Sequence, residues 1–155
     1  YLTAQIEAGA QAVQLFDSWV GVLSPADYER FVLPYSRQVL QAAARQGLPV
    51  IHYGTNTAPL LSQMKSAGGT VMGLDWRIPL NKGQAQLGPE WVVQGNLDPV
   101  LLFAPPKELE RQVRVVLTAA GGSPGHIFNL GHGILTHTPV DTVRAVVDMV
   151  HTWTS

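Results

Sequence analysis

A single unit recurs along this chain: a short apolar segment, then a turn, then an amphipathic helix pattern. The apolar segments are rich in Val, Ile, Leu and Phe without strict alternation, which is typical of strands covered on both faces. Because strands that alternate with helices form βαβ units, the pattern predicts an α/β fold with a parallel sheet. The five predicted strands are Ala12–Ser18, Pro49–Tyr53, Thr70–Trp76, Trp91–Asp98 and His126–His132.

The clearest helix signals lie in residues 24–47. Ser24 is the expected N-cap, Pro25 takes the first helical position and Asp27 completes a capping box. Pro34 interrupts the pattern and predicts a kink or a break, because proline lacks the N–H that an interior helical turn needs. The expected apolar face of this helix consists of Tyr28, Phe31, Val32, Tyr35 and Val39.

Two architectures place helices between parallel strands: a doubly wound open sheet, and part of a (β/α)₈ barrel. No predicted strand is followed by a glycine-rich phosphate loop of the dinucleotide-binding type, which weakens the first. Five strands do not close a barrel, which usually needs about 250 residues, so the second requires additional chain. Because the first methionine is Met64, we expect a piece of a longer protein or a processed one.

The other helix patterns occupy residues 58–67, 105–122 and 138–153, with a short one within 76–88.

The composition excludes several classes of function. The 155 residues carry a formal net charge of −1 and their Lys and Arg do not cluster, so we expect neither a nucleic-acid partner nor an anionic membrane. No apolar run is long enough to span a bilayer. The chain has no cysteine, which excludes disulfides and thiolate metal sites and is compatible with the reducing cytoplasm.

Polar side chains stand at the end of every predicted strand. In parallel α/β folds, ligands bind at the carboxyl ends of the strands, so five polar ends together predict a binding site. Each of these residues taken alone could instead cap a helix or satisfy a loop. The set consists of Asp17, Ser18, His52, Tyr53, Asp75, Gln94, Asn96, Asp98, Asn129 and His132.

Three histidines lie close together in the sequence, which raises the alternative of a zinc site. Three histidines can hold zinc, but His126, His132 and His137 match no helical i, i+4 spacing. His126 begins a predicted strand and His132 ends it, so these two should lie at opposite ends of the sheet. We therefore expect no metal.

Four motifs together resemble the uroporphyrinogen decarboxylase family, over essentially the whole chain. They are FDSWVGVLSPADYERFVLPY (Phe16–Tyr35), GLDW (Gly73–Trp76), QGNLDP (Gln94–Pro99) and HIFNLGHGI (His126–Ile134). The fold of that family is a (β/α)₈ barrel. The resemblance thus implies that residues 1–155 are the C-terminal part, about five βα units, of a single barrel domain.

The resemblance also implies a carboxy-lyase of the haem pathway. Members of the family remove CO₂ from the four acetate side chains of uroporphyrinogen III and give coproporphyrinogen III, with no metal or organic cofactor. The pyrrole ring serves as the electron sink after protonation at the carbon next to the acetate. The implied partners are the tetrapyrrole, the missing N-terminal half of the barrel and a second full-length chain in a cytoplasmic homodimer.

Two substrate-binding residues, and no catalytic one, follow from the resemblance. Ser18 in FDSW and His132 in NLGHG stand where the family has a substrate-contacting hydroxyl and histidine, and both can donate to carboxylates. Gly131 and Gly133 are expected to let the backbone approach a bulky ligand. The family's pyrrole-binding aspartate, N-terminal arginines and site tyrosine belong to the first half of the barrel and have no match here. We therefore expect the isolated chain to be inactive.

Two alternatives stand beside this interpretation. Corrinoid-linked methyltransferase relatives bind zinc through a His-x-Cys motif and a further cysteine, whereas this chain has HYG (His52–Gly54) and no cysteine, which disfavours that chemistry. The other alternative is a non-catalytic binding module, since a half barrel has open sheet edges and an exposed inner face.

Overall fold

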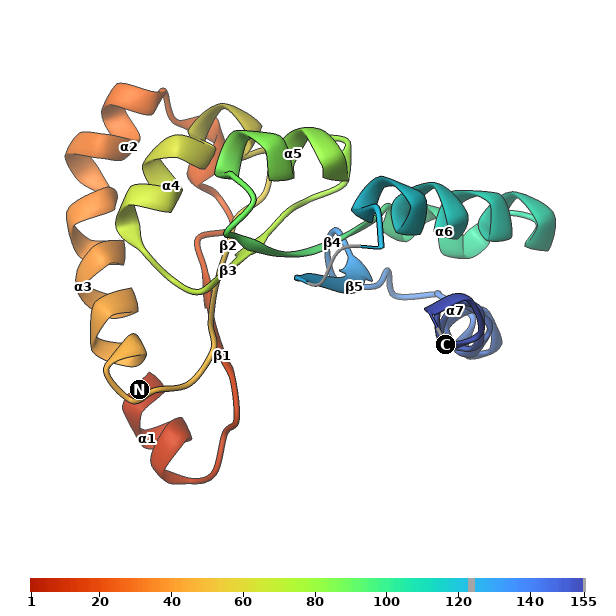
Figure 1. The fold of residues 1–155 in the computed structure, drawn as a ribbon, viewed down its shortest axis with the longest axis horizontal. Helices are drawn as coiled ribbons and strands as arrows, with labels where there is room; N and C mark the ends of the chain where they lie inside the picture. The colour runs from red at the N-terminus through yellow and green to blue at the C-terminus, as the bar shows by residue number, and fades with distance from the viewer. Residues whose placement is uncertain (123–124, 155) are drawn as a thin grey trace.

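The computed structural model describes residues 1–122 and 125–154 and contains one parallel sheet (Figure 1). The strand order is β1–β2–β3–β4–β5, the order in which the strands occur in the sequence. Each strand lies within the range predicted for it, so the predicted α/β fold with a parallel sheet is confirmed. The strands are β1 (Val13–Phe16), β2 (Val50–Tyr53), β3 (Val71–Gly73), β4 (Val92–Leu97) and β5 (His126–Leu130).

Helices connect the strands, and α2 to α6 follow the outer side of the sheet from left to upper right in Figure 1. In the described part of the chain, no helix is both long and apolar enough to cross a membrane. Short 3₁₀ turns at Val20–Val22, Ala58–Leu60 and Pro99–Phe103 supplement the helices. The helices are α1 (Leu2–Glu7), α2 (Pro25–Phe31), α3 (Leu33–Ala44), α4 (Leu61–Ala67), α5 (Leu80–Leu87), α6 (Pro106–Ala120) and α7 (Val140–Thr154).

The first long helix pattern is divided at Val32 into α2 and α3, as the proline at position 34 predicts. Ser24 caps α2, because the Asp27 N–H donates to its hydroxyl (3.2 Å). The predicted continuous apolar face is wrong from Phe31 onward: Phe31, at the end of α2, is 56% exposed, and Tyr35, on α3, is 66% exposed. The break rotates α3 relative to α2, so a different set of residues faces the core. That set is Leu33, Ser36, Leu40 and Ala43.

The hydrophobic core lies between the outer face of the sheet and the helices. Val50, Met72 and Val93 project into it from three neighbouring strands and are fully buried. Burying one such side chain stabilises a fold by roughly 1.5–3 kcal/mol, so this layer fixes the sheet against its helices. The helices contribute Leu40, Leu61, Met64, Leu80, Leu87, Leu109 and Val113.

The sheet curves toward its other, inner face. The Gln94 amide on β4 donates to the side-chain oxygen of Gln14 on β1 (3.3 Å), although β2 and β3 lie between them. In a flat sheet, three steps of about 4.8 Å would separate these strands by about 14 Å. The Tyr53 hydroxyl on β2 likewise reaches the carbonyl oxygen of Gly131, just after β5 (2.7 Å). The five strands therefore form a concave wall.

Candidate functional site on the concave face

A cavity of about 480 Å³ opens on the concave face, at the carboxyl ends of the strands. Both residues predicted to bind substrate line it: Ser18 follows the edge strand β1, and His132 follows the opposite edge strand β5. The curvature of the sheet brings these two residues, which are distant in the sequence, to one site. The cavity is also lined by Gln14, Phe16, Tyr53, Gln94 and Asn129.

Ser18 is held through its backbone, which leaves its hydroxyl available. The Thr55 hydroxyl donates to the Ser18 carbonyl oxygen, and the N–H of Asp17 donates to the Tyr53 carbonyl oxygen (2.7 Å). Within the described residues, the half-buried Ser18 hydroxyl has no hydrogen-bond partner. Ser18 therefore does not act as a cap here, and its hydroxyl can donate to a ligand.

His132 is the exposed residue of a fixed loop. The preceding Gly131 is buried, and its N–H donates to the Leu97 carbonyl oxygen on β4 (2.7 Å). The His132 ring meets the Trp76 ring edge to face, with ring centroids 6.3 Å apart. Among the described residues, the ring nitrogens of His132 have no hydrogen-bond partner, so both remain available to a ligand.

The two glycines beside His132 do not play the same part. A Cβ on Gly131 would lie 2.6 Å from the backbone nitrogen of Trp76, whereas one on Gly133 would meet nothing within 4 Å. We expected both glycines to admit a ligand. For Gly131 the structure gives a different reason, because its missing side chain lets the loop pack closely against Trp76.

Other polar residues at the strand ends face the helices instead of the cavity. The Asp17 carboxylate accepts from the Ser36 hydroxyl of α3 (2.7 Å) and lies 2.8 Å from Nε2 of the fully buried His52. These hydrogen bonds join the sheet to the helix and use both groups within the fold. Asp17 and His52 are therefore structural, and the prediction that every polar strand end contributes to one site is wrong for them.

Asp75, Asn96 and Asp98 are structural for the same reason. The Asp75 carboxylate accepts from the Asn56 N–H and from the Arg77 guanidinium, each at 2.6 Å. The Asn96 amide donates to the carbonyl oxygens of Asp75 (2.9 Å) and Ile78 (2.7 Å). Asp98 accepts from the N–H of Val100 at the start of a 3₁₀ turn (3.0 Å). These three residues fix the loops after β3 and β4.

The cavity itself carries little charge. Its described lining residues include neither Lys nor Arg. Burial raises the pKa of Tyr53 to about 12; the charge of Asp75 adds to this rise, and that of Arg77 opposes it. The Tyr53 hydroxyl thus remains a proton donor at neutral pH. The cavity offers hydroxyl, amide and imidazole groups to a ligand.

His126 lies away from this site, at the start of β5. Its Nε2 is 2.7 Å from the carbonyl oxygen of Gly95, so the ring is engaged within the sheet. His132 follows the other end of the same strand. Across residues 1–122 and 125–154, no group of three His, Asp or Glu side chains is placed to hold a metal ion.

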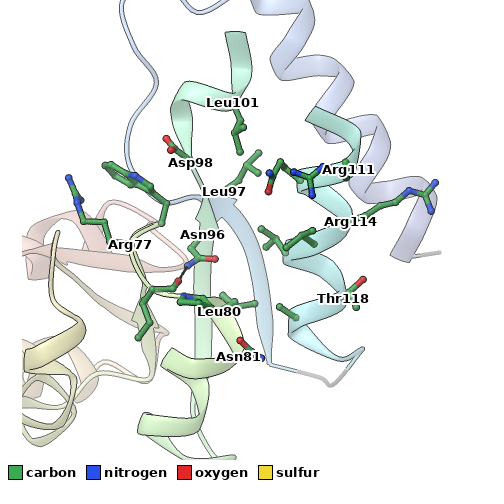
Figure 2. Close-up of a pocket in the computed structure, with 17 residues that line it drawn as sticks. Arg77, Leu80, Asn81, Asn96, Leu97, Asp98, Leu101, Arg111, Arg114 and Thr118 are labelled. Carbon is green, nitrogen blue, oxygen red and sulfur yellow. Dashed lines mark hydrogen bonds between the residues drawn. The ribbon is translucent and has the colours of Figure 1, made fainter. Parts of the chain in front are cut away.

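A second hollow, of about 1050 Å³, lies on the helix side between α5 and α6 (Figure 2). Sequence reasoning missed it, because no motif marks the gap between two helices. Arg77, Arg111 and Arg114 border this groove, and Figure 2 shows Arg77 and Arg114 directed away from its centre. Neither Ser18 nor His132 lines it. The ion-pair partners of the three arginines are Asp75 (2.6 Å), Glu108 (2.6 Å) and Glu110 (3.2 Å).

The curved parallel sheet and its cavity define the class of protein: part of a (β/α)₈ barrel with a cavity at the carboxyl ends of the strands. A solved structure, a methyltransferase from Methanosarcina mazei, matches the whole chain with a TM-score of 0.86 and 21% identity, over 46% of its own length. At this identity the likeness shows the fold alone. The predicted partial barrel is thus confirmed.

The family follows from comparison of the sequences. The family model for uroporphyrinogen decarboxylase matches residues 1–153. The uroporphyrinogen decarboxylase of Sorangium cellulosum is 59% identical over 150 residues, 97% of this chain and 43% of that protein. That of Streptomyces coelicolor is 53% identical over 155 residues, 100% of this chain and 44% of that protein. This chain belongs to the uroporphyrinogen decarboxylase family and spans less than half the length of these relatives.

Proposed function

We propose that this chain is the C-terminal part of a single barrel domain that decarboxylates a tetrapyrrole. Residues 1–155 supply about five βα units of it. The substrate is uroporphyrinogen III, whose four acetate side chains lose CO₂ to give coproporphyrinogen III. The observation that supports this proposal is a single cavity lined by both Ser18 and His132, in a chain of the uroporphyrinogen decarboxylase family.

Ser18 and His132 orient the substrate in this proposal. The hydroxyl and an imidazole N–H donate to its carboxylates from opposite edges of the cavity. The bond between the acetate CH₂ and CO₂ breaks while the pyrrole, protonated next to the acetate, takes up the electron pair. The CH₂ carbon then takes up a proton to become a methyl group, and the ring loses the proton that it gained. This chemistry uses no metal or organic cofactor.

The lining of the cavity supports a division of labour within the barrel. A polyanionic substrate is attracted by cations, and the described residues around the cavity include neither Lys nor Arg. In this proposal the first half of the barrel supplies the arginines, together with the aspartate that binds the pyrrole N–H groups and a tyrosine. The isolated chain is then inactive, because it holds only part of the site.

The two edge strands carry the surface that the rest of the barrel covers in this proposal. Their side chains toward the concave face include Phe16 on β1, 64% exposed, and Ile127 on β5, 43% exposed. Apolar side chains on unpaired edge strands favour association with further strands. In this proposal the whole barrel, with both of its halves, forms a homodimer in the cytoplasm.

A chimeric protein tests the proposal. The Sorangium cellulosum relative has its matching 150-residue segment replaced by this chain, which gives what we call the completed barrel. We expect the completed barrel to convert uroporphyrinogen III into coproporphyrinogen, measured by chromatography after oxidation to the porphyrins. We expect none from the isolated chain.

Either of two results would contradict the proposal: the first its division of labour, and the second its decarboxylase activity. Coproporphyrinogen production by the isolated chain would show that it holds a whole site. A completed barrel that folds and binds the tetrapyrrole but releases no CO₂ would favour the non-catalytic binding module instead.

A further inference from the structure

Tyr53, on the concave face at the end of β2, joins the two halves of the site. Its hydroxyl donates to the carbonyl oxygen of Gly131 (2.7 Å), the residue before His132. The ring is 6% exposed and packs edge to face against Phe16, with centroids 5.7 Å apart. On the next strand, a Cβ at Gly73 would lie 2.8 Å from the Tyr53 ring. Tyr53 is therefore wedged in one orientation, with its hydroxyl aimed at the His132 loop.

Gly131 is held from three directions. Its N–H donates to Leu97 on β4 (2.7 Å), its carbonyl oxygen accepts from Tyr53 on β2 (2.7 Å), and its Cα packs against the backbone of Trp76. His132 follows directly and is exposed to the cavity. Because its ring has no hydrogen-bond partner among the described residues, its position depends on the backbone of Gly131 and the edge of Trp76.

The end of β2 also holds the other half of the site. The Tyr53 carbonyl oxygen accepts from the N–H of Asp17 (2.7 Å), and the Thr55 hydroxyl donates to the Ser18 carbonyl oxygen. One short segment thus contacts the backbone on both sides of the cavity. The Tyr53 carbonyl oxygen and the Thr55 hydroxyl hold the Ser18 side of the cavity, and the Tyr53 hydroxyl holds the His132 side.

We propose that Tyr53 is a positioning residue, whose hydroxyl sets the place of His132 in the site through the carbonyl oxygen of Gly131. This inference rests on the proposed function, in which His132 contacts the substrate. The hydroxyl stays protonated through neutral pH, because burial raises the pKa of Tyr53 to about 12. Removing the hydroxyl takes away one of the three contacts that hold Gly131 while leaving the packing of the ring unchanged.

The test is a double-mutant cycle of Tyr53→Phe and His132→Ala in the completed barrel. We expect Tyr53→Phe alone to lower kcat/KM by roughly ten- to hundredfold, since small misplacements of a binding group have effects of this size. In the His132→Ala background, Tyr53→Phe should change kcat/KM less than about twofold, because non-additivity marks residues that act through one another. Tyr35→Phe is the matched control, because Tyr35 is 66% exposed on α3.

A second measurement follows His132 directly. We expect the ring resonances of ¹⁵N-labelled His132 to shift and broaden in Tyr53→Phe, while those of the exposed His137 stay unchanged. The melting temperature should fall by only a few degrees, as roughly expected for one lost hydrogen bond.

Different failures are distinguishable. If His132→Ala is as active as the unchanged protein, the proposed substrate contact is wrong, and the positioning role is wrong with it. If His132→Ala lowers kcat/KM but Tyr53→Phe leaves it unchanged, only the positioning role is wrong. An equal loss from Tyr53→Phe in both backgrounds, or the same shift of the His137 resonances, would also overturn it, because Tyr53 would then act independently of His132.

Discussion

Asp17 and Ser18 are neighbours at the end of β1, yet they serve opposite faces of the sheet. Asp17 turns outward to Ser36 and the buried His52, and its hydrogen bonds close within the protein. Ser18 lines the concave cavity with His132, and neither side chain has a described hydrogen-bond partner. The outer pair, Asp17–His52, is thus hydrogen-bonded within the fold, whereas the inner pair, Ser18–His132, is available to a ligand. A polar strand end is a candidate functional group only on the face that no helix covers.

The strongest way to break the outer pair is Asp17→Ala. Its loss leaves the Ser36 hydroxyl and the His52 ring without their acceptor in a buried place, so the free energy of unfolding should fall by about 3 kcal/mol. Urea denaturation of the completed barrel measures this. Asp141→Ala is the control, because that carboxylate is exposed and forms a surface ion pair with Arg144 (3.2 Å). Equal losses in the two variants would mean that Asp17 contributes no more than a surface charge.

The inner pair should show the reverse pattern in His132→Ala. We expect kcat/KM for uroporphyrinogen to fall about 100-fold, about 2.7 kcal/mol, as for a lost hydrogen bond to a carboxylate. The melting temperature should hardly change, because the side chain is exposed and its ring contact is the edge-to-face one with Trp76. His137→Ala serves as the control outside the cavity. If His132→Ala instead melts far below the unchanged protein, His132 is a packed residue and the comparison fails.

Gly131→Ala and Gly133→Ala test whether the two glycines beside His132 differ in how closely the loop packs around them. The first adds a Cβ that would lie 2.6 Å from the Trp76 nitrogen, while the second adds one in open space. We expect Gly131→Ala to lower the free energy of unfolding by about 2 kcal/mol and to reduce activity, since overpacking displaces the loop. Gly133→Ala should leave stability almost unchanged. Thermal denaturation and kcat/KM of both variants provide the check, and similar stability losses would contradict the close approach at Gly131.

Ser18→Ala should give the smallest effect. One uncharged donor to a carboxylate is lost, so kcat/KM should fall about tenfold, about 1.4 kcal/mol. Stability should be retained, because the contacts that hold Ser18 use its backbone. Ser62→Ala, on the exposed side of α4, is the matched control. A loss of stability without a loss of activity would mean that Ser18, like Asp17, stabilises the fold and does not bind substrate.

Much of the fold could be read from local patterns in the sequence. Apolar runs located all five strands, and Ser24 and the proline at position 34 set the start of α2 and its break from α3. The apolar face of α3 could not be read in this way. Its orientation depends on how far the chain turns at Val32, which follows from packing against the sheet and not from helical periodicity.

The sequence by itself determined the family and the parallel strand–helix order, because motifs and hydrophobic runs are local. It also indicated Ser18 and His132, through their motifs. Only the tertiary structure decided that Asp17 faces outward and Ser18 inward. Alternation places successive residues on opposite faces, but when both faces are apolar it does not say which one the helices cover. The role of Tyr53 likewise depends on curvature that brings β2 to the end of β5, a contact between distant segments that no local pattern contains.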